Sequence, residues 1–217
     1  RPLSPTIRGS VFNYSFALEI TTTHGLTPTA AMNQALTAVD AYNIVQAAST
    51  GNDSAFTSTP LPMTWPAQHT VTVGVTAVIW DDSGLSCYAN QGEIAMWGGG
   101  VARGQGSCTP ATILAQCLSG NHPEYCVTGW DPDSATNYAY GLGTSYATPQ
   151  VVGLAAQGIE SQGSPPGDWP DPDLIRDYLH DLVIDNPDPS NLEIGVIGNP
   201  YANLTGHATY LPLLIKE

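Results

Sequence analysis

A serine set between small residues and followed by an apolar stretch is the group in this chain best suited to do chemistry. Residues 143–149 read Gly-Thr-Ser-Tyr-Ala-Thr-Pro and contain Ser145. Glycine permits unusual backbone angles, and the free amide groups at a helix N-terminus favour developing negative charge. Downstream, Val151, Leu154 and Ile159 recur at helical spacing, which predicts a buried helix. Ser145 is therefore a candidate nucleophile for acyl transfer.

Asn52 is the second candidate, because it follows a short apolar stretch and a turn. A buried strand is predicted over residues 44–48, and the turn Ser-Thr-Gly-Asn that ends at Asn52 would present an amide side chain. An amide donor aimed at a developing oxyanion contributes about 3–4 kcal/mol of transition-state stabilisation. Gly-Asn is also an ordinary turn sequence, so this role requires a nucleophile nearby.

Residues 143–153 resemble the serine motif of the subtilases, the subtilisin-like serine peptidases, and read Gly-Thr-Ser-Tyr-Ala-Thr-Pro-Gln-Val-Val-Gly here. In that family a strand ending in Ala-Ala-Gly-Asn supplies an oxyanion asparagine and part of the primary specificity pocket; this chain has a more polar variant. The resemblance implies that Ser145 attacks the scissile carbonyl while Asn52 and the Ser145 backbone amide stabilise the oxyanion. It also implies that the residues before Asn52 bind substrate: Ala48, Ser49, Thr50 and Gly51.

The segment Gly9–Ala17 resembles the subtilase strand that carries an Asn-x-Ser sequence beside the substrate. The resemblance implies that Ser15, Phe16 and Ala17 line the cleft, where an extended polypeptide substrate would add a strand through main-chain hydrogen bonds. Taken without the resemblance, these residues predict an aromatic and β-branched core strand.

A serine hydroxyl is a poor nucleophile unless a histidine takes its proton and a carboxylate orients that histidine. The subtilase Asp-Thr/Ser-Gly and His-Gly-Thr motifs precede the strand at Asn13, where this sequence has neither. His24 and the segment Asp81–Gly84 imitate these motifs but stand in the wrong chain order, and both are predicted to be loops. The other histidines lie in no matching context: His69, His122, His180 and His207.

Three explanations remain open for the missing base and acid. A separate N-terminal chain could carry them, the protein could be a catalytically inactive subtilase scaffold with a structural or binding role, or the sequence could be incomplete. The start at Arg1, without a methionine or a hydrophobic secretory segment, is consistent with proteolytic processing. We expect a heterodimer, because the missing segment would supply parallel strands and an unpaired sheet edge invites association.

The resemblance implies a doubly wound α/β fold, with a mainly parallel sheet, helices on both faces, and a separate N-terminal chain that completes it. The whole chain, 1–217, is predicted to be the C-terminal portion of a single subtilase catalytic domain. Trp65-Pro66 matches a step that is often cis in subtilases. Strands are expected near residues 10–15, 44–48, 71–75, 91–98 and 209–214, and helices over 27–43, after Ser145 and over 168–180.

The composition predicts a secreted globular protein that binds neither nucleic acid nor membrane. The 217 residues are 42% hydrophobic, which suffices for one core, and hold no apolar run long enough to span a bilayer. Five Lys and Arg against 19 Asp and Glu give a net charge of −14, which argues against binding to nucleic acid or anionic lipid. A single lysine, Lys216, and the low total charge favour an extracellular setting.

Four cysteines lie in a glycine-rich region between Asn52 and Ser145: Cys87, Cys108, Cys117 and Cys126. Their spacing fits neither a metal pair nor a redox motif, so two disulfides are predicted, with Cys87 to Cys108 and Cys117 to Cys126 favoured among three pairings. Free thiols are the alternative if the protein is intracellular.

The predicted chemistry requires no cofactor. Three Asp-Pro phrases, at Asp131, Asp171 and Asp188, could supply oxygen ligands to a structural calcium ion. Asp-Pro is also ordinary helix-start and turn sequence, so both interpretations stay open.

Overall fold

The computed structural model describes residues 10–17, 30–79, 84–101, 103, 113–117, 137–162, 170–185 and 195–197. A six-stranded sheet forms the centre, in the order β1-β2-β3-β4-β8-β7. All neighbouring strands are parallel except β7, which runs antiparallel to β8. The strands are β1 (Val11–Tyr14), β2 (Val45–Ser49), β3 (Val73–Val78), β4 (Ile94–Trp97), β7 (Val183–Asp185) and β8 (Gly195–Ile197).

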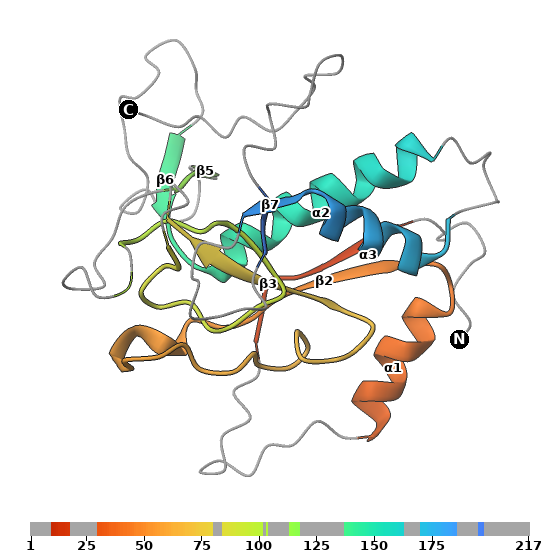
Figure 1. Cartoon of the computed structure of the whole chain (residues 1–217), viewed down its shortest axis with the longest axis horizontal. Helices are drawn as coiled ribbons and strands as arrows, with labels where there is room; N and C mark the ends of the chain where they lie inside the picture. The colour runs from red at the N-terminus through yellow and green to blue at the C-terminus, as the bar shows by residue number, and fades with distance from the viewer. Residues whose placement is uncertain are drawn as a thin grey trace.

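In the described part of the chain three α-helices flank the sheet: α1 (Ala30–Asp40), α2 (Thr144–Ser161) and α3 (Pro172–Asp181). Figure 1 shows α2 and α3 on one side of the sheet and α1 on the other. The helix α3 starts in the way its sequence predicts, because the Asp171 side chain accepts a hydrogen bond from the Asp173 amide and Pro172 occupies the first turn. A short 3-10 helix, η2 (Asp53–Phe56), follows the turn after β2.

The main core lies between the sheet and α2. Every residue of β2, β3 and β4 is buried, as expected for parallel strands that are covered on both faces. One face of these strands packs against the apolar side of α2, where Val151, Leu154 and Ile159 are buried. The opposite face of β2 meets α1, since the buried Gln46 side chain donates to the carbonyl oxygen of Leu36 at 3.0 Å.

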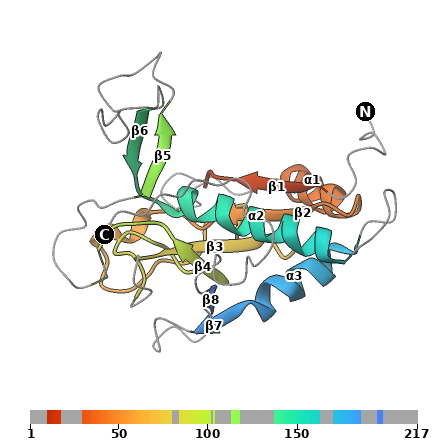
Figure 2. The same cartoon turned by 90° about the horizontal axis from the view of Figure 1, so that it is seen from above.

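The helix α2 contacts all four strands from β1 to β4 and also α3. It lies across the sheet in Figure 2, where the separate antiparallel pair β5 (Ile113–Cys117) and β6 (Asn137–Gly141) projects away from the sheet. Since β6 ends just before α2 begins, the chain delivers the N-terminus of α2 to the carboxyl ends of the central strands.

The predicted strands 10–15, 44–48, 71–75 and 91–98 correspond to β1–β4, and the three predicted helices correspond to α1–α3. The Trp65-Pro66 bond is cis, as predicted. The strands β5 to β8 were not predicted. The expected strand at residues 209–214 lies outside the described residues.

Cys87 is buried and disulfide-bonded, and no free cysteine occurs in the part of the chain that the structure describes. Cys117 ends β5, whereas Cys108 and Cys126 lie outside the described residues. The pairing of the four cysteines therefore stays a prediction.

Candidate active site

Ser145 is the second residue of α2, and the glycine before the helix has a conformation that few other residues adopt. Gly143, the N-cap, has φ = 140° and ψ = 158°. A Cβ added at Gly143 would lie 3.2 Å from Nδ2 of Asn52. The backbone angle favours glycine at this position, and a side chain there would also push against Asn52, so geometry restricts the motif residue two positions before Ser145.

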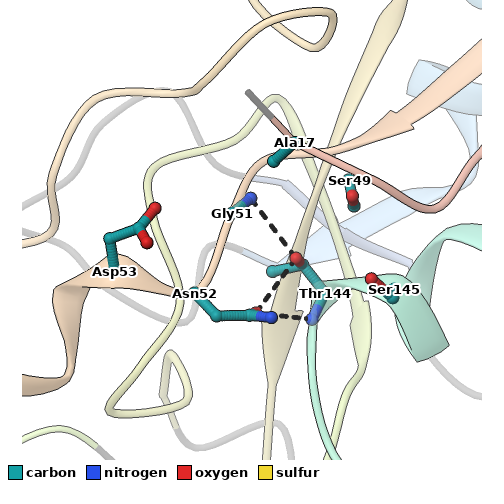
Figure 3. A pocket seen from close by; sticks show the side chains of 7 residues that line it. All are labelled: Ala17, Ser49, Gly51, Asn52, Asp53, Thr144 and Ser145. Atoms are coloured by element: carbon teal, nitrogen blue, oxygen red, sulfur yellow. Dashed lines mark hydrogen bonds between the residues drawn. The ribbon is translucent and has the colours of Figure 1, made fainter. Parts of the chain in front are cut away.

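Asn52 lies beside the N-terminus of α2 (Figure 3). Its side-chain oxygen, Oδ1, accepts hydrogen bonds from the Thr144 amide at 2.9 Å and from the Thr144 hydroxyl at 3.1 Å. The Thr144 hydroxyl in turn accepts from the Gly51 amide at 3.3 Å. These bonds occupy the acceptor end of the Asn52 amide and leave its Nδ2 donor, together with the Ser145 amide of the first helical turn, available to a ligand.

The Ser145 hydroxyl donates to the carbonyl oxygen of Ser15 at 3.1 Å. In return, the Ser15 hydroxyl donates to the carbonyl oxygen of Ser145 at 3.1 Å and to Oδ1 of Asn13 at 2.8 Å. Pro149 has no amide hydrogen, so it cannot bond the Ser145 carbonyl four residues earlier as a helix normally would. Ser15 supplies that missing donor and so ties the end of β1 to the nucleophile turn.

A pocket of about 230 Å³ opens beside Ser145. Figure 3 displays its lining, which comes from the ends of β1 and β2 and the start of α2: Ala17, Ser49, Gly51, Asn52, Asp53, Thr144 and Ser145. Five of these seven were predicted from the sequence; Asp53 and Thr144 were not. The lining is mostly polar and contains one carboxylate, that of Asp53. Such a pocket suits a ligand with hydrogen-bonding groups, such as a peptide, better than an apolar ligand.

Four other residues predicted to bind substrate do not line this pocket, and one of them, Ser15, bonds Ser145 instead. Ala48 is fully buried within β2. Thr50 is fully buried, and its carbonyl oxygen accepts from the Thr64 amide and the Asn90 side chain. Phe16 is 49% exposed and lies against Trp65, with ring centroids 6.4 Å apart. Phe16 therefore presents an aromatic surface next to the pocket, whereas Ala48 and Thr50 support it from behind.

Asn90 holds the turn that carries Asn52. Its buried side chain accepts from the Asp53 amide at 3.2 Å and from the Ser54 hydroxyl at 2.7 Å. It donates to the Thr50 carbonyl oxygen at 3.1 Å and to the Asp53 carboxylate at 3.2 Å. One amide thus satisfies four polar groups of the turn and holds the chain on both sides of Asn52. No local sequence signal marks Asn90.

Tyr88 holds the other half of the site. Its hydroxyl accepts from the Gly143 amide at 3.0 Å and contacts the carbonyl oxygens of Gly98 and Gly99 at 2.5 and 2.9 Å. Burial raises the pKa of Tyr88 to about 12, although hydrogen bonds with Ser86 and Gly143 lower it. The phenol is therefore neutral at physiological pH.

The described residues place no histidine at this pocket. His69 lies in the turn before β3, where its Nδ1 accepts from the Val71 amide at 3.4 Å, and His180 is exposed in the last turn of α3. His24, His122 and His207 lie outside the described residues, as do Asp81 to Ser83. The predicted loop positions of His24 and the Asp81 segment thus stay predictions.

Among the described residues no group of three or more His, Cys, Asp or Glu could hold a metal ion. Asp171, in one of the three Asp-Pro phrases, uses its carboxylate to cap α3, while Asp131 and Asp188 lie outside the described residues. A calcium site that uses Asp131 or Asp188 stays a prediction. No helix in the described part of the chain is long and apolar enough to cross a membrane.

The subtilase family (peptidase S8) matches residues 7–186, and the chain belongs to this family. No protein of curated function matches the chain by sequence. Its fold is similar to that of proteases from Pseudoalteromonas arctica PAMC 21717, with a TM-score of 0.59 and 21% identity over 87% of this chain and 48% of that one.

Two further solved structures agree on the fold. A lanthipeptide protease has a TM-score of 0.63 and 18% identity, covering 87% of this chain and 59% of that one. A cold-adapted subtilisin-like serine proteinase has a TM-score of 0.56 and 17% identity, covering 88% and 55%. The predicted subtilisin-like α/β fold is thereby confirmed. The chain spans about half to three-fifths of the length of these structures.

Proposed function

We propose that this chain is the nucleophile-bearing part of a subtilisin-like serine endopeptidase. The observation that supports it is the joint position of Ser145 and Asn52, which bring a hydroxyl and a side-chain donor to the same pocket. The chain also lies in the subtilase family over most of its length. The acceptor side of Asn52 is already bound by Thr144, so its donor side is oriented before any substrate arrives, as electrostatic stabilisation requires.

In this mechanism the oxygen of the Ser145 hydroxyl attacks the carbonyl carbon of the scissile peptide bond, and its proton passes to a general base. The carbonyl oxygen becomes an oxyanion that receives hydrogen bonds from Nδ2 of Asn52 and from the Ser145 amide. The C–N bond then breaks, the amine leaves with the proton, and the acyl group stays on Ser145. Attack by water releases the acid and restores the hydroxyl.

The substrate is proposed to be a polypeptide in extended conformation that lies along residues Ser15–Ala17. Ser15 and Phe16 are exposed beyond the end of β1, and Ala17 lines the pocket. Backbone groups there can pair with an added strand, and the pocket between Ser49 and Asp53 would take one substrate side chain.

The general base and its orienting carboxylate are proposed to come from a separate N-terminal chain. Within the described residues β1 pairs only with β2, which leaves one long side of β1 without a neighbouring strand. Such an edge in a parallel sheet normally receives another strand. A strand added beside β1 would end next to Ser15 and hence next to the Ser145 hydroxyl. We further propose that the two chains arise by proteolytic processing of a secreted protein.

An inactive subtilase scaffold with a structural or binding role is the second candidate. The absence of a histidine at the pocket among the described residues favours it. The presence of both the Ser145 hydroxyl and the Asn52 side-chain amide favours an active peptidase over this second candidate.

Intact mass analysis of the purified native protein, before and after a fluorophosphonate probe, with sequencing of each co-purifying chain, tests the proposal. We expect a mass increase localised to Ser145 and a companion chain with Asp-Thr/Ser-Gly and His-Gly-Thr motifs. Labelling of Ser145 without a companion chain would refute the two-chain arrangement but retain the peptidase. Absence of both labelling and companion would favour the inactive scaffold.

A further inference from the structure

The glycine that precedes the nucleophile helix is attached to the turn after β4 in two ways, by a direct backbone bond and through one buried side chain, that of Tyr88. Tyr88 is 4% exposed, and its hydroxyl lies 3.0 Å from the Gly143 amide, which donates to it. The same hydroxyl donates toward the carbonyl oxygens of Gly98 and Gly99. The Gly143 amide also bonds the Gly98 carbonyl directly at 2.9 Å. A closed network therefore links the exit of β4 to the entry of α2.

The three glycines after β4 give the Tyr88 ring its place. A Cβ at Gly98 would lie 2.9 Å from the Tyr88 hydroxyl oxygen, and a Cβ at Gly100 would lie 2.8 Å from a ring carbon. Gly99 and Gly100 also have positive φ values of 74° and 95°, which residues with a side chain rarely adopt. Hence the absence of side chains in the Gly-Gly-Gly turn leaves the space that the Tyr88 ring occupies, and the turn packs closely against the ring.

The network reaches the reacting groups through two consecutive residues. The Gly143 amide is held by Tyr88, and the next amide, of Thr144, donates to Oδ1 of Asn52. The residue after that is Ser145. A shift of Gly143 would thus move both the anchor of the Asn52 amide and the backbone that carries the nucleophile.

We propose that Tyr88 is a positioning residue that sets the distance between the Ser145 hydroxyl and the Asn52 donor by fixing Gly143 against the turn after β4. This inference rests on the proposed peptidase function. Tyr88 touches no substrate in this arrangement; it acts through Gly143 and Thr144. Since misplacement of reacting groups by about 1 Å can lower a rate a hundredfold, the loss of one anchoring hydroxyl should be visible in the chemical step.

The test compares Tyr88→Phe with Thr72→Val in the native protein together with any companion chain. Thr72→Val also removes a buried hydroxyl that bonds loop carbonyl groups, those of Pro66 and His69, but it does so at the opposite end of β3. The readouts are the rate of Ser145 labelling by a fluorophosphonate, kcat and KM on a peptide substrate, thermal stability, and hydrogen exchange of the Gly143 amide.

We expect Tyr88→Phe to lower both the labelling rate and kcat by about 10- to 100-fold with KM changed less than about twofold, and to speed exchange at Gly143. Thr72→Val should lower thermal stability but leave labelling within about twofold of the original protein. A labelling rate for Tyr88→Phe within twofold of the original protein would overturn the inference. So would an equal loss of rate in both variants, because the effect would then follow from lost stability alone.

Failure of the proposed function gives a different pattern. If the original protein is not labelled at all, the peptidase proposal fails, and exchange at Gly143 then decides the positioning role alone. Faster exchange in Tyr88→Phe but not in Thr72→Val would support the anchoring of Gly143 by Tyr88; unchanged exchange in both would refute it.

Discussion

The two ends of the parallel sheet use polar groups in opposite ways. At the amino ends, Arg176 of α3 bonds Asp40 of α1 at 3.0 Å and the Val71 carbonyl oxygen at 3.3 Å. The charged side chain there links α3 to α1 and to the segment before β3. At the carboxyl ends, the groups on the pocket are mostly neutral, and Ser145 and Asn52 remain accessible. The comparison teaches that an ion pair joins the helices at the amino ends, whereas hydrogen bonds of neutral groups hold Ser145 and Asn52 in place at the carboxyl ends.

Replacement of Ser145 should have the largest effect on the carboxyl end and almost none on the amino end. Ser145→Ala removes the proposed nucleophile, so fluorophosphonate labelling and acyl-enzyme formation should disappear while the thermal unfolding temperature changes little. Ser161→Ala, at the exposed far end of the same helix, is the matched control and should label normally. Normal turnover by Ser145→Ala would sink the mechanism.

Asn52→Ala should lower kcat by roughly a hundredfold or more, because it removes one oxyanion donor. Its cost in stability should be about 1–3 kcal/mol, since the amide and hydroxyl of the buried Thr144 lose their acceptor. Steady-state kinetics on a peptide substrate measures the first effect and thermal unfolding the second. A rise in KM with kcat unchanged would contradict the assignment of Asn52 to the transition state.

Much of the fold could be predicted because the strands β2–β4 and the helix α2 carry clear local patterns. The site was found through short motifs at Ser145 and Asn52, which need no knowledge of their neighbours. Tyr88 and Asn90 could not be found in this way, because their importance arises from hydrogen bonds to segments distant in sequence. The strands β7 and β8 have three residues each, too few for an alternating pattern to appear.

Arg176→Met tests the amino end. It keeps an unbranched side chain but breaks the bonds to Asp40 and Val71, so the free energy of unfolding should fall by about 1–2 kcal/mol. Urea denaturation measures this loss, and the labelling rate of Ser145 should stay unchanged under folding conditions. Asp173→Asn, which removes the charge from the exposed partner on α3, should lower the free energy of unfolding by less. An equal decrease in the two variants would contradict the larger contribution assigned to the bonds with Asp40 and Val71.

Glu93→Gln should give the smallest effect, and its size depends on pH. Burial raises the pKa of the Glu93 carboxyl, opposed by the Gly74 amide and the charges of His180 and Arg176. A raised carboxyl pKa means that the stability contributed by protonated Glu93 is present at low pH and is lost as pH rises through the folded pKa. Glu93→Gln should therefore remove this loss and flatten the stability profile between the unfolded-state pKa and the raised folded-state pKa. Denaturation curves between pH 4 and pH 8 measure it; an unchanged slope would contradict the prediction.

The bonds that assemble the site also determine when it can exist. Ser15 and Ser145 bond each other across 130 positions of the chain, and Asn52 and Thr144 across 92. During synthesis, the end of β1 and the Asn52 turn emerge long before α2. Until α2 follows, they lack the hydrogen bonds with Thr144 and Ser145. The Ser145 hydroxyl and the Asn52 side chain become neighbours only after α2 has docked on β1 to β4. The candidate site is therefore complete only in the folded molecule.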